Sequence, residues 1–288
     1  MTYRTIRALV EAHVNQNDFE FKSLVQKIAA KQRDEQKRAA LLDPLRKLDD
    51  IPSDVATLVR EAQPTSINDL VLLPRVQRQL NEIGRELRHR EELQKHNLKV
   101  QSRLLFYGPP GNGKTSCAAA IAGWLGIRAF SLELSSVINS YLGETGKLLA
   151  KALRVLNSGH MLIIDEIDAI ATSRTRDDGA VSREYNTIVA AFLAALDKPN
   201  GGILIATTNR FDIIDSAIVR RFDATVKFPA PSIELMNRLV EKLCTKFNVP
   251  AMEVSIADCK NFDDVEKAVQ RIACRRALDK IEKIKLNS

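Results

Sequence analysis

The sequence predicts an α/β protein in which a parallel five-stranded sheet is sandwiched by helices. From residue 103 onward, short apolar runs of strand length alternate with segments of helical spacing, a pattern typical of parallel sheets. A glycine-rich loop directly follows the first of these runs and leads into a helical segment. After residue 231 the apolar spacing is wholly helical, which predicts a small helical lid behind the sheet.

Five apolar runs give the expected strands, at residues 104–107, 128–132, 161–164, 203–207 and 225–228. Helices are expected between them where apolar residues recur three or four positions apart, as at Leu149, Leu153 and Leu156. The sheet and its helices therefore account for most of the middle of the chain.

The chain divides into three expected parts: a helical N-terminal element at residues 1–63, a large α/β domain at 64–230 and the helical lid at 231–288. Apolar residues at helical spacing, such as Ile6, Leu9 and Val10, indicate helices in the first part. Pro52 and Pro64, with Ser and Thr beside them, mark its end.

Composition excludes several classes of protein. With 45% hydrophobic and 27% charged residues among 288, the chain can bury a core and is not mainly disordered. No apolar run approaches the roughly 18 residues of a membrane span, and the first residues lack a signal peptide's apolar stretch, so the cytoplasm is the expected location. Four scattered cysteines indicate neither a disulfide framework nor a zinc site. The net charge of +7 is spread thinly, which makes nucleic acid the less favoured partner.

The loop after the first expected strand matches the Walker A pattern G-x-x-x-x-G-K-T. Its glycines let backbone N–H groups surround phosphate oxygens, and the following helix adds the positive end of its dipole. Lys114 is expected to reach the β- and γ-phosphates, and the Thr115 hydroxyl to ligate Mg²⁺. A chance glycine-rich turn is the alternative, which the strand before and the helix after disfavour. The expected nucleotide-binding residues are Gly108, Pro109, Pro110, Gly111, Asn112, Gly113, Lys114, Thr115 and Ser116.

Two carboxylates, Asp165 and Glu166, end the third expected strand, where α/β sheets present ligand groups. Asp165 can hold Mg²⁺ through its water shell, while Glu166 can orient and polarise the water that attacks the γ-phosphate. A pair of merely exposed carboxylates is the alternative, and the loop at Lys114 makes it the weaker one. No firm role is assigned to Asp168.

Together these features resemble the AAA family of P-loop ATPases, over roughly residues 67–280. The resemblance implies ATP and Mg²⁺ as ligands and ATP hydrolysis as the activity. The string at residues 206–210, Ala-Thr-Thr-Asn-Arg, looks like the sensor-1 strand of the family. It implies that Asn209 lies between the two Walker elements and hydrogen-bonds the γ-phosphate or the attacking water.

Residues 215–223, Asp-Ser-Ala-Ile-Val-Arg-Arg-Phe-Asp, resemble the segment that carries the arginine fingers of the family. Arg220 and Arg221 would then reach the nucleotide site of a neighbouring subunit and stabilise charge on the transferred phosphoryl group. The alternative is that both arginines pair with local carboxylates such as Asp223. The Arg-Arg-Phe ending is most similar to the meiotic branch of the family.

Before the second Walker element, Tyr141, Leu142 and Gly143 stand where the family carries its pore loop. The resemblance implies that Tyr141 grips an extended polypeptide in the channel of a ring. The alternative is a half-buried tyrosine before a helix. The polar stretch 174–183 is a candidate second channel loop or a solvated loop.

Two departures from the family pattern concern the base of the nucleotide. The linker at residues 68–74 lacks the usual glycines, and the lid has Asn-Phe-Asp-Asp at 261–264 where small residues are usual. Adenine as the base is therefore implied by the family alone.

The leading functional prediction is an ATP-driven ring, with six copies expected, that remodels, unfolds or disassembles a protein substrate. The N-terminal element would recruit the substrate or an adaptor, and a separate protease partner is left open. The alternatives are a nucleic-acid loader or helicase, and a nucleotide-dependent assembly switch.

Overall fold

The computed structural model describes residues 53–63, 65–140, 145–172, 179–197 and 201–286, with seven positions among the first 29 residues. The expected pore-loop residues Tyr141, Leu142 and Gly143 lie outside these ranges, as does most of the expected N-terminal element. Within these ranges, no helix combines the length and the apolar character that crossing a membrane requires.

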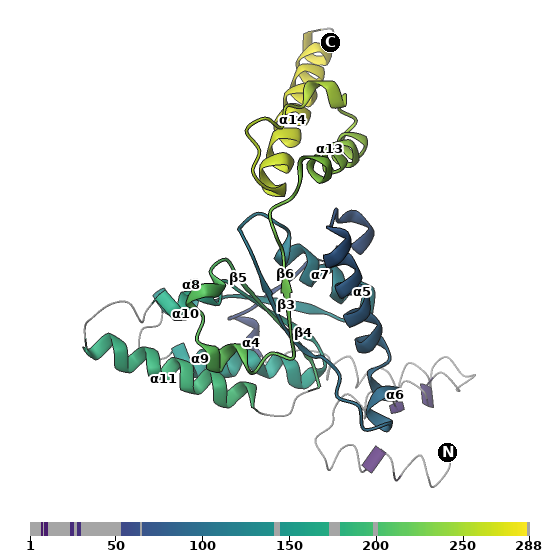
Figure 1. Cartoon of the computed structure of the whole chain (residues 1–288). Coiled ribbons are helices and arrows are strands. Elements are labelled where there is room, and N and C mark those ends of the chain that lie inside the picture. The colour runs from purple at the N-terminus through teal and green to yellow at the C-terminus, as the bar shows by residue number, and fades with distance from the viewer. Residues whose placement is uncertain are drawn as a thin grey trace.

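A six-stranded sheet forms the centre of the molecule, in the order β1-β3-β4-β5-β2-β6 (Figure 1). Five of its strands are parallel, and each begins and ends within one residue of the sequence prediction. The strands are β1 (Arg60–Glu61), β2 (Arg103–Tyr107), β3 (Ala129–Glu133), β4 (Met161–Asp165), β5 (Ile203–Thr208) and β6 (Ala224–Lys227).

The sixth strand, β1, was not predicted. It has two exposed residues and pairs antiparallel with β3 at the edge of the sheet. The same segment places Val55 and Val59 in the core against the sheet. Two polar residues give no apolar alternation, so the sequence carried no signal for this strand. The segment lies inside the expected N-terminal element, whose limit at residue 63 stays a prediction.

Helices cover both faces of the sheet. The α-helices are α4 (Ser53–Ala56), α5 (Pro74–Arg88), α6 (Arg90–Lys95), α7 (Lys114–Leu125), α8 (Leu134–Ser140), α9 (Thr145–Ala152), α10 (Asp168–Thr172), α11 (Gly179–Leu196), α12 (Ser216–Val219), α13 (Ile233–Phe247) and α14 (Phe262–Leu286). The 3₁₀ turns are η1 (Ile67–Asp69), η2 (Leu153–Ser158), η4 (Phe211–Ile213) and η5 (Ala251–Glu253).

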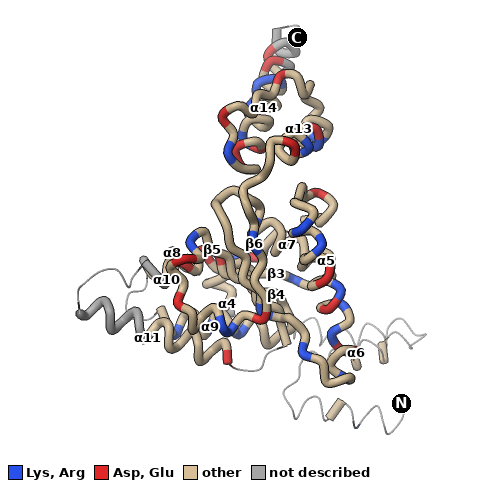
Figure 2. Tube along the Cα trace, in the orientation of Figure 1, with Lys and Arg blue, Asp and Glu red and all other residues tan. Residues whose placement is uncertain are grey.

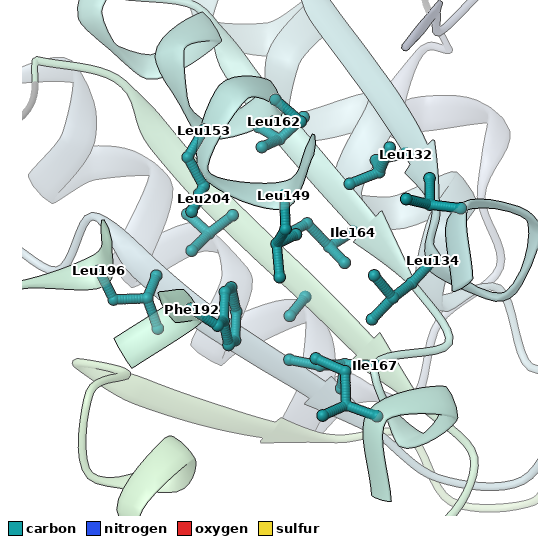
Figure 3. Packing of buried hydrophobic residues seen from close by; sticks show 14 of the residues in the cluster. Leu132, Leu134, Leu149, Leu153, Leu162, Ile164, Ile167, Phe192, Leu196 and Leu204 are labelled. Carbon is teal, nitrogen blue, oxygen red and sulfur yellow. The ribbon is translucent and has the colours of Figure 1, made fainter. Parts of the chain in front are cut away.

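Two hydrophobic clusters hold these layers together. On one face Leu149 of α9 and Phe192 of α11 pack on Leu162 and Leu204 of the inner strands (Figure 3). The other face packs against α5 and α7, as at Leu80. Because neighbouring residues of a strand point to opposite faces, the inner strands must be apolar throughout. This explains why continuous apolar runs predicted them to within one residue.

The lid is formed by α13 and α14, which share a cluster of their own that includes Val240 and Val269. The chain enters it directly after β6, and it lies beyond the ends of the parallel strands (Figure 1). Ser232 caps α13 by accepting a hydrogen bond from the N–H of Leu235 at 3.3 Å. The lid thus stands over the edge of the sheet where β6 and the other parallel strands end.

Candidate functional site

Three strands deliver the predicted site residues to one edge of the sheet. Strand β5 lies between β4 and β2, and all three are parallel. The chain that follows β2 is the glycine-rich loop, Asp165 ends β4 with Glu166 directly after it, and Asn209 follows β5. Because parallel strands end at the same edge, these groups meet there, with Asn209 between the other two.

The glycine-rich loop packs so tightly that its first residue has to be glycine. Gly108 has φ 144°, and a Cβ atom there would lie 2.0 Å from the carbonyl oxygen of Phe228. The loop ends where α7 begins at Lys114, so the N-terminal N–H groups of a 12-residue helix face it. Such a helix start attracts anions, and phosphate above all.

Lys114 is the centre of the site. Its Nζ atom donates to the carbonyl oxygens of Gly108 and Pro109, both at 2.9 Å, and to Oδ1 of Asn209 at 2.8 Å. Burial lowers the pKa of Lys114, while the charges of Asp165 and two neighbouring carboxylates oppose that shift. None of its three hydrogen-bond acceptors carries a charge, so the positive charge of the ammonium remains available to a phosphate.

A hydroxyl and a carboxylate meet beside the lysine. The Thr115 Oγ1 atom lies 3.1 Å from both carboxylate oxygens of Asp165. Hydroxyl and carboxylate oxygens are the ligands that Mg²⁺ prefers, and it usually takes only one or two of them from protein while phosphates supply others. In the described part of the chain, no cluster of three His, Cys, Asp or Glu side chains could hold a metal by itself. The donor set therefore fits an ion that arrives with a nucleotide.

Glu166 has an unusual backbone. Its φ of 56° lies in the left-handed region, which non-glycine residues adopt at a cost. Its side chain is exposed at the site. Partial desolvation raises the pKa of Glu166, and the negative charges of Asp165 and Asp168 raise it further. A more basic carboxylate is a better acceptor for the proton of an attacking water.

Sequence reasoning missed the polar end of β5. Thr207 and Thr208 are fully buried, yet their hydroxyls bind the carboxylates of Asp165 and Asp168, the second at 2.9 Å. Asp168 also accepts from the N–H of Asn209 at 3.3 Å. The sequence did contain a signal for these contacts. Two hydroxyl residues end one apolar run, and carboxylates end the run that forms the neighbouring strand.

The two predicted arginine fingers stand apart from this cluster. Arg220 is exposed directly after α12, and Arg221 binds Asp197 through Nε at 2.7 Å and Nη2 at 3.2 Å. Asp223, the expected local partner, instead binds Lys99 at 2.7 Å and accepts from two backbone N–H groups at the start of β2. Neither arginine is joined to Lys114 within the described chain.

The lid reaches the site at two places. The N–H of Asp263 in α14 donates to the carbonyl of Gly111 at 3.1 Å, and Lys242 of α13 donates to the carbonyl of Asn68 in the linker. Next to the second contact, a cavity of about 450 Å³ opens between linker, α5 and lid. Its lining residues are Ile67, Asn68, Leu70, Val71, Leu72, Gln77, Asn81, Arg238 and Lys242.

The glycine-rich loop at residues 108–115, here called the P-loop, also contacts the segment between β6 and α13 that leads into the lid. Asn112 donates through Nδ2 to the carbonyl of Pro229 at 3.3 Å. Asn112 is buried, and its Oδ1 atom has no hydrogen-bond partner in the described structure. The loop is thus attached to the lid and to the chain that leads into it.

Known proteins are similar in sequence to most of the chain. The model of the ATPase family associated with various cellular activities (AAA) matches residues 104–230. An uncharacterized AAA family ATPase, y4kL of Sinorhizobium fredii, is 35% identical over 222 residues, which cover 75% of this chain and 67% of that protein. The chain belongs to the AAA family. This AAA protein therefore binds nucleotide and hydrolyses ATP.

Two further relatives of this AAA protein carry more specific names. The 26S proteasome regulatory subunit 6A of Encephalitozoon cuniculi is 32% identical over 222 residues, 74% of this chain and 54% of that protein. A proteasome-activating nucleotidase of Methanosphaerula palustris is 32% identical over 200 residues, 66% of this chain and 48% of that protein. The chain thus spans about half the length of these two relatives.

Proposed function

We propose that this AAA ATPase assembles into a ring, with six copies as the expected number, and uses ATP hydrolysis to remodel, unfold or disassemble a protein substrate. The observation that carries the proposal is the position of Arg220 and Arg221, outside the cluster formed by Lys114, Asp165 and Asn209. In the proposed assembly, the arginine that completes each site comes from a neighbouring copy. The names of the two proteasome-related proteins support a ring that acts on proteins.

The residues of the site divide the work of hydrolysis among them. Lys114 and the N–H groups at the start of α7 bind the phosphates, and Thr115 and Asp165 would hold Mg²⁺, which supplies charge neutralisation when bound. Glu166 orients the attacking water and takes its proton, while the Asn209 amide, already next to Lys114, fixes the γ-phosphate end. A neighbour's guanidinium stabilises the charge that develops on the transferred group.

We assign the cavity of about 450 Å³ to the base and ribose end of the nucleotide, because residues of the linker, of α5 and of the lid line it together. Its lining is rich in polar side chains, including Asn68 and Asn81, which can donate and accept hydrogen bonds. Adenine as the base agrees with the ATPase activity.

Pore-loop threading is the proposed route from hydrolysis to work on a protein. Tyr141, Leu142 and Gly143 would contact the substrate, and the N-terminal element would recruit it or an adaptor. A separate protease that receives the product stays part of the proposal, as the names of the proteasome-related relatives suggest.

A nucleic-acid loader is the second candidate function, and the charge pattern disfavours it. Figure 2 shows Lys and Arg interleaved with Asp and Glu along α5 and α14, without a continuous basic stripe on these helices. Nucleic-acid binding draws on clusters of basic residues that neutralise phosphates. A nucleotide-dependent assembly switch is the third candidate.

Stimulation of the ATPase rate separates these candidates. We expect unfolded protein to raise the steady-state rate several-fold at saturating ATP, and single-stranded DNA to leave it unchanged. Tyr141→Ala should keep the basal rate and lose the response to unfolded protein. Stimulation by DNA alone, weakening steeply with salt, would favour the loader, and a slow rate that responds to neither would favour the switch.

Replacing Arg221 tests the role of the neighbouring copy. Arg221→Ala should bind nucleotide normally yet hydrolyse it at least about 100-fold more slowly, because a trans-acting guanidinium is worth roughly 10³ to 10⁵ in rate. Arg128→Ala is the matched control, since Arg128, just before β3, likewise binds a carboxylate, that of Glu61, through Nε at 2.8 Å and Nη2 at 3.1 Å. Mixing Arg221→Ala with Lys114→Ala subunits should restore part of the rate, because each supplies what the other lacks. A normal rate in Arg221→Ala, or no gain on mixing, would contradict the trans role.

A further inference from the structure

Thr207 is a buried hydroxyl residue to which neither the motifs nor the family match assigns a role. It occupies the second-to-last position of β5 and is 1% exposed. Strand β5 is otherwise apolar up to Ala206, so packing alone does not require a hydroxyl at this point. The partners of its hydroxyl explain its presence, since they are Asp165 at the end of β4 and Glu166, which follows it.

We propose that Thr207 is a positioning residue for ATP hydrolysis, whose hydroxyl holds the Asp165 carboxylate and the Glu166 backbone in one fixed arrangement. The hydroxyl accepts from the N–H of Glu166 at 3.3 Å and donates to Oδ1 of Asp165. A hydroxyl has a single proton, and an ionised carboxylate can only accept. The direction of both bonds therefore follows from chemistry.

The main chain of Thr207 holds the same turn from a second point. Its carbonyl oxygen accepts from the N–H of Ile167 at 2.9 Å. The register between β4 and β5 ends at the pair Ile164 and Ala206, so Asp165, the last residue of β4, is paired with β3 but not with β5. Thr207 supplies the hydrogen-bond acceptors for the two N–H groups that follow the end of β4.

The hydrogen bonds with Thr207 act at Glu166, the residue of the site with a strained backbone. Glu166 has φ 56°, and a non-glycine residue keeps such a conformation only where its surroundings fix it. Thr207 accepts from the N–H of Glu166 on one side and from that of Ile167 on the other. Without the hydroxyl, the first of these two restraints is lost.

The same hydroxyl orients the carboxylate on the metal side. Asp165 lies between two hydroxyls, those of Thr207 and Thr115, the latter 3.1 Å from each of its oxygens. Hydrogen-bond partners behind such a group typically change metal affinity or activity about 10- to 100-fold when removed. One side chain thus contacts both residues that the proposed mechanism uses, Asp165 through its carboxylate and Glu166 through its backbone N–H.

The test uses the full chain with Thr207→Val, which keeps the shape and removes the hydroxyl, and Thr207→Ser, which keeps the hydroxyl. We expect Thr207→Val to lower kcat about 10- to 100-fold with little change in KM for ATP. The Mg²⁺ concentration that half-saturates binding of a fluorescent ATP analogue should rise, and Thr207→Ser should restore both quantities to within about threefold. Thr225→Val, at an exposed position of β6, controls for the substitution itself.

A wild-type kcat and Mg²⁺ requirement in Thr207→Val would overturn the inference, as would a Thr207→Ser variant that is no better than Thr207→Val. Melting temperatures measured alongside show whether Thr207→Val is folded, and the Ser variant decides the matter if it is not. The inference rests on the proposed role of Glu166, so Glu166→Gln is measured in the same assay. An active Glu166→Gln would refute that role, whereas an inactive Glu166→Gln beside an active Thr207→Val would refute the inference alone.

Discussion

Lys114→Ala is expected to abolish nucleotide binding, raising the Kd for ATP at least about 100-fold. The wild-type ammonium is buried and held in place by three neutral oxygens, so it meets the phosphates without first being pulled away from a carboxylate. Alanine removes that charge from a site that keeps Asp165 and Glu166, whose negative charges then repel the phosphates.

The gain in melting temperature on adding ATP provides the measurement, because a ligand that binds only the folded state stabilises it. Wild-type protein should show a gain that grows with ATP concentration, and Lys114→Ala should show none. Lys95→Ala is the control, since Lys95 is exposed and pairs with the nearby Glu92 at 3.0 Å. A wild-type gain in Lys114→Ala would mean that the nucleotide binds elsewhere.

Glu166→Gln is expected to keep ATP binding and lose turnover by about 10² to 10⁴-fold. Glutamine has nearly the same shape, yet its amide cannot take up the proton of the attacking water. The backbone N–H of residue 166 can still bind Thr207, so the local structure should persist. Single-turnover hydrolysis of bound ATP measures the chemical step directly.

Electron-microscopy images of Glu166→Gln particles with ATP test whether the protein assembles into a ring. Bound but uncleaved ATP should trap a closed ring, with any engaged polypeptide in its centre. Glu234→Gln, exposed in the first turn of α13, is the control and should hydrolyse normally. Single subunits that hydrolyse at full speed would remove the basis for a ring.

The central site could be predicted from short sequence motifs, because each motif consists of residues that are close together in the sequence. The glycines, Lys114 and Thr115 lie within one turn and the helix that follows it, and parallel strands ending at one edge then bring Asp165 and Asn209 to them. The apolar runs predicted the five parallel strands for the same reason, since both faces of the inner strands are buried. The roles of these residues in catalysis remain predictions until the variants are measured.

Contacts between segments that are far apart in the chain could not be predicted from the sequence. Arg221 pairs with Asp197, 24 positions away, although Asp223 stands only two residues from it. Asp223 faces the start of β2, because the return of the chain into β6 places it there. The two polar residues of β1 form a strand by pairing with β3, and the hydroxyls at the end of β5 bind carboxylates at and after the end of β4. Neither contact can be read from the residues themselves.

The attachment of the P-loop to the lid has a mechanical consequence. Gly111 accepts a hydrogen bond from the first turn of α14, and Asn112 donates one to the segment before α13. One short loop is therefore attached to the lid and also to the segment that connects the lid to the sheet. If both hydrogen bonds persist when a phosphate enters or leaves, a rearrangement of the loop moves the lid with it. A shift that the loop passes to the first turn of α14 would be larger at the far end of this helix, because Leu286 lies 23 residues beyond Asp263.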